Sequence, residues 1–213
     1  MLFTDRAHGN LSSVGGELAE HGEAARERLR SRIGALRLAR GYQVHGTRVA
    51  WIDDAQAVAH APRAGRDEAD GQATALTGVA AMVLAADCVP VALVGDGAVA
   101  MLHAGWRGLA AGVLEAGVGV LREQGHRGPL RAIVGPCAGA CCYEVGAEVH
   151  AAFGLAQTVG RLDLRAIAQQ RLLAAGVAEV EHAAACTICD ERFFSHRREG
   201  TRAGRQAGVA WLS

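Results

Sequence analysis

Four short apolar segments follow one another in the middle of the chain, and they constrain the fold more than any other feature. They consist mainly of alanine, valine and leucine, and glycine or aspartate lies between them. Short apolar runs bounded by turn residues are typical of strands that are buried in a sheet. We therefore predict adjacent strands, at least some of them buried on both faces, over residues 72–76, 81–85, 89–94 and 98–103.

Helical patterns surround this strand-rich region. Apolar residues recur at helical spacing over residues 109–121. Further helices are predicted over residues 17–33, 143–153 and 164–175, and further strands over 131–134, 177–182 and 209–212. Half of the 213 residues are apolar, which is enough for a substantial core. We expect a single domain over residues 1–213, an α/β (α+β) sandwich with a central mixed β-sheet and helices packed outside.

The charge composition excludes several classes of function. All 22 basic residues are arginine, so neither a Schiff-base lysine nor a P-loop lysine is available. The formal net charge is zero and there is no basic block, which argues against nucleic acid as a partner. The first residues lack the apolar stretch of a signal peptide, and no uninterrupted apolar segment reaches transmembrane length. We expect a cytoplasmic protein without a membrane partner, whose six cysteines are thiols or metal ligands.

Three residues that can bind a metal each lie at a break in a predicted β-segment. His45 precedes Gly46 in a β-rich segment, Cys88 lies between two predicted strands, and His103 ends the strand before the turn at residues 104–108. Two imidazoles and one thiolate can form a tetrahedral zinc site with one open position, as in catalytic zinc sites. Copper is chemically possible at such a site. The alternative is a core thiol with two structural histidines.

Two carboxylates lie near these residues in the sequence. Asp70 and Asp87 can each orient a metal-bound histidine or act as an acid or base. The alternative for Asp87 is a turn aspartate that bonds its local backbone beside Pro90.

A segment rich in cysteine and glycine, residues 135–146, precedes a predicted helix. Backbone N–H groups at a helix N-terminus can bind an anion such as phosphate. A helix N-terminus also lowers the pKa of a thiol, which makes Cys137 or Cys141 a candidate nucleophile. The alternative is a glycine-rich turn with small buried thiols.

Two further features lie late in the chain. Cys186 and Cys189 have CxxC spacing, but no second pair at a matching distance accompanies them, so a structural zinc site is not expected there. Residues 193–205 contain a phenylalanine pair and four arginines, which can hold a phosphate or a carboxylate. The alternative is a solvated charged loop anchored by two core phenylalanines.

Taken in order, these segments resemble one family. The family is that of the YfiH-type proteins, also called laccase-domain or multicopper polyphenol oxidase-like proteins. The resemblance covers nearly the whole chain, although residues 10–40 look shortened. It rests on QVHG (43–46), ADCVPV (86–91), HAGWRG (103–108), GPCAGACCYEVG (135–146) and FFSHRREGTRAGR (193–205).

The resemblance implies a zinc ion held by His45, Cys88 and His103. It also implies phosphorolysis of adenosine, inosine, guanosine and methylthioadenosine, together with deamination of adenosine. Purine nucleosides and phosphate are then the expected partners. A copper-dependent oxidation of phenols is attached to the family name, but this chain lacks the many histidines and HxH pairs that multicopper oxidase sites need. Some relatives are assigned to removing misincorporated residues from peptidoglycan precursors.

Specific roles follow for individual residues under the nucleoside hypothesis. Phosphate would be held by arginines and would attack the ribose C1′, with three candidates: Arg48, Arg107 and Arg198. In deamination, protons would reach the leaving ammonia from a carboxylate or a nearby thiol. The candidates for this transfer are Asp70, Asp87 and Cys137.

Other classes of function stay open. One is a cysteine-dependent hydrolase acting on an amide of a cell-wall precursor, with Cys88 or Cys137 as nucleophile and His103 or His45 as base. Another is a copper-dependent phenol oxidase. A non-catalytic binding role is the third, and it leaves the three candidate ligands at strand ends unexplained. We favour a monomer, because the small residues on the predicted helices permit self-association without requiring it.

Overall fold

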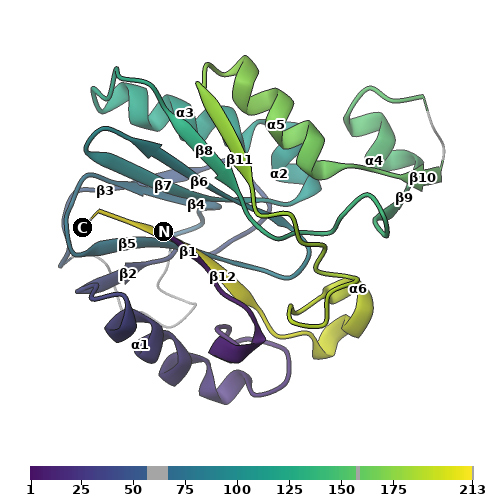
Figure 1. Ribbon diagram of the computed structural model, residues 1–213, viewed down its shortest axis with the longest axis horizontal. Helices are drawn as coiled ribbons and strands as arrows, with labels where there is room; N and C mark the ends of the chain where they lie inside the picture. Colours follow the sequence, from purple (N-terminus) through teal and green to yellow (C-terminus); the bar gives the residue numbers. More distant parts are fainter. Residues whose placement is uncertain (57–66, 157–158, 213) are drawn as a thin grey trace.

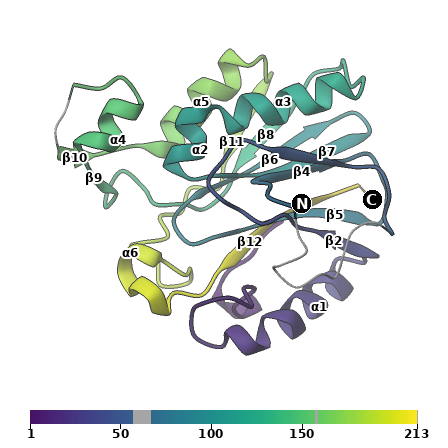
Figure 2. The same cartoon turned by 180° about the vertical axis from the view of Figure 1, so that it is seen from behind.

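The computed structural model describes residues 1–56, 67–156 and 159–212, and Figures 1 and 2 show it from opposite sides. Two β-sheets lie face to face, and helices cover the outer face of each sheet. The predicted mixed α/β sandwich with outer helices is confirmed. Its strands are divided between two main sheets, a division that the sequence did not reveal.

The larger sheet has six strands in the order β11-β8-β6-β7-β4-β3. They are β3 (Val49–Ile52), β4 (Gly71–Thr74), β6 (Val89–Gly95), β7 (Ala98–Ala104), β8 (Arg131–Val134) and β11 (Glu179–His182). Strands β6 and β7 form an antiparallel pair in which Pro90 lies opposite His103. This register brings Cys88, just before β6, to the end of β7 that carries His103.

The smaller sheet has four strands in the order β1-β12-β5-β2. They are β1 (Leu2–Phe3), β2 (Arg37–Ala39), β5 (Val79–Ala85) and β12 (Gln206–Trp211). The sequence predicts β5 beside β4 and β6, but β5 instead pairs with β12 and β2. The chain therefore crosses from one sheet to the other between β5 and β6.

Strand β5 can occupy this central place because it is apolar on both faces. Ala81 and Val83 pack into the core between the two sheets. Ala80 and Met82 point the other way, into the core that the smaller sheet shares with helix α1 (Gly22–Arg32). The alternation places successive residues of β5 in two different hydrophobic cores.

The six α-helices in the described ranges lie outside the sheets. Besides α1 they are α2 (Trp106–Ala111), α3 (Val113–Glu123), α4 (Ala147–Ala152), α5 (Leu164–Ala174) and α6 (His196–Glu199). Helices α3 and α5 cover the larger sheet, and α1 covers the smaller one (Figure 1). Within these ranges, each helix lacks the length or the apolar character needed to span a membrane.

Three helices differ from their predicted bounds. The helix predicted over residues 17–33 begins as α1 at Gly22, after a short 3-10 helix at Ala19–His21. The helix predicted over residues 109–121 is divided at Gly112, whose φ of 102° lies in the left-handed region. The helix predicted from residue 143 begins at Ala147. The residues before it form strand β9 (Glu144–Gly146), which pairs with β10 (Val159–Arg161) in a small separate sheet.

Candidate metal-binding active site

The fold brings together the three residues predicted as metal ligands. His45 lies between β2 and β3, Cys88 between β5 and β6, and His103 in β7. Their ligand atoms all lie within 4.8 Å of one another. The Sγ atom of Cys88 is 3.8 Å from Nε2 of His45, and the two imidazole rings meet edge to face with centroids 5.0 Å apart. The three side chains thus form one group of the size that a metal ion requires.

These three side chains lie at different depths. His103 is only 3% exposed, Cys88 is half-buried, and His45 is exposed. The group is therefore anchored in the interior at His103 and reaches solvent at His45. Two imidazoles and one thiol with a solvent-facing side fit zinc that keeps an open fourth position.

Asp70 is fully buried directly before β4, and it joins two of the candidate ligands. Its Oδ1 accepts hydrogen bonds from Nδ1 of His103 (2.8 Å) and from the backbone N–H of His45 (3.0 Å). Its Oδ2 accepts from the backbone N–H groups of Val44 and Gly46, at 3.0 and 2.7 Å. A carboxylate acceptor keeps the proton on Nδ1 and leaves Nε2 of His103 available to a metal. Asp70 was predicted either to orient a metal-bound histidine or to act as an acid or base. Its contacts agree with the first of these roles.

The pKa of Asp70 agrees with this role. Burial opposes its ionisation, but the hydrogen bonds from His103 and from the backbone of the His45 loop hold the pKa below its usual value. Asp70 is therefore a carboxylate at neutral pH, and it accepts hydrogen bonds without donating any.

The loop that carries His45 is strained and closely packed. His45 has a φ of 62°, in the left-handed region that residues other than glycine rarely adopt. A Cβ atom at Gly105 would lie 2.5 Å from Cδ2 of His45, and one at Gly108 would lie 2.7 Å from the carbonyl oxygen of Gly46. Glycine at positions 105 and 108 therefore lets the turn after β7 approach the His45 loop.

Asp87 directly precedes Cys88 in the chain, and its contacts fix the backbone at this point. It has a φ of 89° and lies at the crossing between the two sheets. Its carboxylate accepts hydrogen bonds from Oγ1 of Thr187 (2.6 Å), Oγ of Ser195 (3.1 Å) and the backbone N–H of Arg197 (2.7 Å). These partners are distant in sequence, so Asp87 joins the late segments of the chain to the site instead of capping a local turn.

The charges in the group favour a bound cation. Burial opposes ionisation of Cys88, but the charge of His103 and hydrogen bonds from both imidazoles lower the pKa of the thiol to about 6. Burial also opposes protonation of His103, yet the Cys88 thiolate and the Asp70 carboxylate raise its pKa to about 9. The thiolate is the form of cysteine that binds metals, and a metal cation would take the place of the proton that these anions stabilise.

Two of the arginines predicted to bind phosphate are engaged in other contacts. Arg198 donates to three backbone carbonyl groups and to the carboxylate of Glu199. Arg48 donates to the carbonyl oxygen of Glu68 (2.8 Å) and, at 3.5 Å, to the carboxylate of Asp67. The guanidinium of Arg198, in α6, therefore binds the segment that precedes this helix, and that of Arg48 lies against the segment before Asp70.

Arg107 differs from both. It is exposed, and its guanidinium stacks over the ring of Trp106 at 4.2 Å from the centroid. A further arginine, Arg205, was not singled out from the sequence. Burial lowers the pKa of Arg205, although the nearby negative charges of Cys88 and Asp87 act to raise it. Its place in the arginine-rich late segment was the only signal available to sequence reasoning.

The predicted activation of Cys137 and Cys141 by a helix N-terminus is wrong. Cys137 is fully buried, and this burial raises its pKa to about 11 despite the nearby Arg165. Cys141 lies in a turn, six residues before α4 begins at Ala147. Neither thiol therefore has the helix environment that would make it a strong nucleophile.

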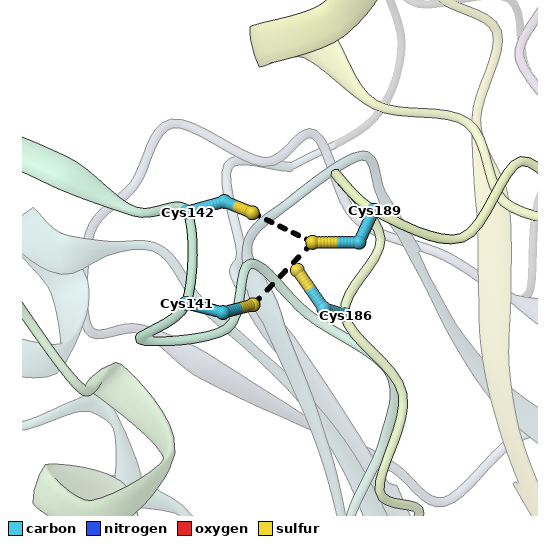
Figure 3. Close-up of side chains that lie close together, drawn as sticks. All are labelled: Cys141, Cys142, Cys186 and Cys189. Atoms are coloured by element: carbon cyan, nitrogen blue, oxygen red, sulfur yellow. Dashed lines mark hydrogen bonds between the residues drawn. The ribbon is translucent and has the colours of Figure 1, made fainter.

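The expectation that Cys186 and Cys189 lack a partner pair is also wrong. Cys141 and Cys142 lie beside them, and the four thiols form a second group of metal-binding size (Figure 3). Throughout the described ranges, the candidate metal groups are this cluster and the group of His45, Cys88 and His103.

Comparison with known proteins agrees with this architecture. Residues 4–213 match the family model described as multi-copper polyphenol oxidoreductase laccase. A Xylella fastidiosa (strain Temecula1) protein named purine nucleoside phosphorylase is 40% identical over 223 residues, covering 96% of this chain and 84% of its own. The hypothetical protein YfiH of Bacillus licheniformis has a TM-score of 0.85 at 26% identity, with 96% of this chain and 85% of that chain covered. Protein NMB0706 of Neisseria meningitidis has a TM-score of 0.82 at 32% identity, with 96% and 86% covered. The chain therefore belongs to the multi-copper polyphenol oxidoreductase laccase family, the family of the YfiH or laccase-domain proteins.

Proposed function

We propose that this protein is a purine nucleoside phosphorylase that holds a zinc ion at His45, Cys88 and His103. The observation that carries the proposal is the convergence of these three ligands, anchored by Asp70 and open to solvent at His45. The name of the Xylella fastidiosa relative supports the reaction class. Phosphorolysis of methylthioadenosine and deamination of adenosine belong to the same proposal, because these substrates share the purine nucleoside framework.

Phosphorolysis exchanges one bond at the ribose for another. A phosphate oxygen forms a bond to C1′, and the bond between C1′ and N9 breaks. Its electron pair leaves with the purine, which takes up the proton that the phosphate gives up, so the products are a ribose 1-phosphate and the free base. Zinc at the three ligands would supply a Lewis acid that can polarise a substrate oxygen or activate water.

In this proposal, Arg107 binds the phosphate. Its guanidinium is exposed and lies over the ring of Trp106, 4.2 Å from the centroid, and it offers a planar fork of donors. Such a fork matches the oxygens of phosphate with paired hydrogen bonds. Arg205 adds positive charge close to Cys88. Asp70 acts as a positioning residue that fixes His103 and the His45 loop.

One observation favours a second candidate function. Cys88 has a pKa of about 6 and lies beside two imidazoles, an arrangement that also suits a nucleophilic cysteine with a histidine base. A cysteine-dependent hydrolase of a cell-wall precursor amide is therefore the alternative. It requires no metal, and alkylation of Cys88 would abolish its activity.

The test is the release of free base from inosine and adenosine by the purified protein, with and without phosphate. We expect hypoxanthine or adenine together with ribose 1-phosphate only when phosphate is present. Chelation should stop the release, and zinc should restore it. Amide hydrolysis that persists after chelation would instead support the cysteine hydrolase. Uptake of O₂ with phenols only after copper loading would support an oxidase.

A further inference from the structure

Two loops that are distant in sequence bring four cysteines to one point. Cys141 and Cys142 come from the turn before β9, and Cys186 and Cys189 from the segment after β11. All four Sγ atoms lie within 4.8 Å of one another. The Sγ atom of Cys189 is 3.4 Å from that of Cys141 and 2.6 Å from that of Cys142, and Figure 3 shows the four sulfurs converging.

The backbone holds these two loops together independently of the thiols. Residues Cys137 and Cys186 form a parallel β-bridge, and the backbone N–H of Thr187 donates to the carbonyl oxygen of Cys137 at 3.0 Å. Within the second loop, the backbone N–H of Asp190 donates to the carbonyl oxygen of Cys186 at 2.9 Å. The convergence of the four side chains therefore follows from a preformed backbone arrangement.

The surroundings of Cys186 suit a thiolate. The backbone N–H of Gly139 donates to its Sγ at 3.2 Å, and a hydrogen bond of this kind stabilises a negatively charged sulfur. Gly139 also makes room for the cluster, because a Cβ atom there would lie 3.3 Å from the Sγ atoms of both Cys141 and Cys186.

We propose that Cys141, Cys142, Cys186 and Cys189 bind a second, structural zinc ion, separate from the site at His45, Cys88 and His103. Tetrahedral zinc with Zn–S bonds of about 2.3 Å places its sulfur ligands about 3.8 Å apart. The four sulfurs lie within 4.8 Å of one another, and zinc binding would require those of Cys142 and Cys189, 2.6 Å apart, to separate by about 1.2 Å. Four thiolates and no other ligand are a closed structural set. A single disulfide would use only two of the four sulfurs and leave the convergence of the others unexplained.

The second zinc would stabilise the part of the protein that positions Cys88. Thr187 lies inside the CxxC segment, and its Oγ1 donates to the carboxylate of Asp87 at 2.6 Å. In the first loop, the backbone N–H of Ala138 donates to the carbonyl oxygen of Asp87 at 2.9 Å. Both loops of the cysteine cluster therefore contact the residue that precedes Cys88.

The test is a count of zinc per chain in the full-length protein, purified with zinc and without chelators, by elemental mass spectrometry. We expect about two zinc ions in the wild type and about one in Cys189→Ala and in Cys88→Ala. The matched control is Cys137→Ala, which removes a buried thiol beside the cluster and should keep both ions. A count that depends on Cys88 but not on Cys189 would overturn the proposal.

A second measurement, which leaves all four cysteines of the cluster in place, covers the case in which Cys189→Ala does not fold. The Cys88→Ala variant loaded with Co²⁺ should show the charge-transfer bands of tetrahedral cobalt bound only by thiolates. Absence of these bands would overturn the proposal, as would an intact mass showing that the purified protein holds these cysteines as a disulfide. Because neither readout involves nucleosides, failure of this proposal and failure of the phosphorylase proposal are distinguishable.

Discussion

Nδ1 of His103 donates a hydrogen bond to Oδ1 of Asp70 at 2.8 Å, and both side chains are almost completely buried. The same carboxylate oxygen accepts the backbone N–H of His45. One buried anion thus fixes the imidazole of one candidate ligand and the backbone of another. Removing its charge should weaken the metal site without removing any metal ligand.

The first prediction concerns this carboxylate. In Asp70→Asn the amide keeps one acceptor oxygen and loses the charge that favours a cation, so zinc affinity should fall about 10- to 100-fold. Competition with a chromophoric chelator measures this affinity. Asp67→Asn is the matched control, because Asp67 is exposed and only loosely paired with Arg48. Equal zinc affinity in wild type and Asp70→Asn would show that Asp70 does not position the ligands.

The second prediction concerns the turn after β7. In Gly105→Ala the new methyl group would lie 2.5 Å from the His45 ring, so His45 must move and zinc binding should be weakened or lost. Gly119→Ala is the control, because a Cβ atom there has no neighbour within 4 Å. Alanine in helix α3 should stabilise the fold by up to about 1 kcal/mol. Zinc content and thermal unfolding of both variants check this prediction, which fails if Gly105→Ala binds zinc normally.

The third prediction concerns phosphate. Replacement of Arg107 by glutamine removes an exposed guanidinium at the start of α2, between the two glycines that pack against the His45 loop, so the KM for phosphate should rise by about tenfold, or about 1.4 kcal/mol. The KM for the nucleoside should change much less. Arg127→Gln is the control, because it removes an exposed arginine from the loop after α3. Steady-state kinetics with varied phosphate measure this KM. The assignment is contradicted if Arg107→Gln has the same KM for phosphate as Arg127→Gln and the wild type.

The fourth prediction is a pH dependence of stability. Burial raises the pKa of Glu199, but the arginines at positions 6 and 198 outweigh this and hold it below its usual value. Its stabilising effect is therefore complete above the ordinary glutamate pKa and is lost as the pH falls through the lowered folded-state pKa. Glu199→Gln should lower the free energy of unfolding by about 1 kcal/mol at pH 7 and by much less in acid.

Denaturant unfolding at several pH values measures this difference. The control is Glu191→Gln, which changes an exposed carboxylate in the segment before α6 and should have little effect at any pH. A Glu199→Gln penalty that stayed constant down to strongly acidic pH would show that the charge of Glu199 is not what stabilises the loop.

Local patterns marked His45, Cys88 and His103 as candidate metal ligands but left open a core thiol with two structural histidines, and only the resemblance to the family favoured the metal group that the fold brings together. His45, Cys88 and His103 each lie where an apolar β-segment is interrupted, and polar residues at such breaks gather at the edge of a sheet. The mixed α/β class followed from the same alternation of strand and helix patterns. The assignment of β5 to the second sheet could not be predicted, because its apolar sequence suits any position that is buried on both faces.

Long-range pairing explains what sequence reasoning missed. The four-cysteine cluster depends on the bridge between Cys137 and Cys186, and adjacent cysteines do not follow the usual spacing of zinc ligands. The engagement of Arg198 was hidden for a similar reason. Its guanidinium donates to carbonyl groups in a loop that precedes it, and carbonyl positions cannot be read from residue types.

The most direct test of the phosphorylase proposal compares wild type and Cys88→Ala in parallel for bound zinc and for phosphate-dependent release of hypoxanthine from inosine. Far-ultraviolet circular dichroism confirms that the variant is folded. We predict that the wild type releases base and that Cys88→Ala loses both the active-site zinc and the phosphorolysis. A folded Cys88→Ala protein that retains full phosphorolysis would contradict a reaction that depends on metal at His45, Cys88 and His103.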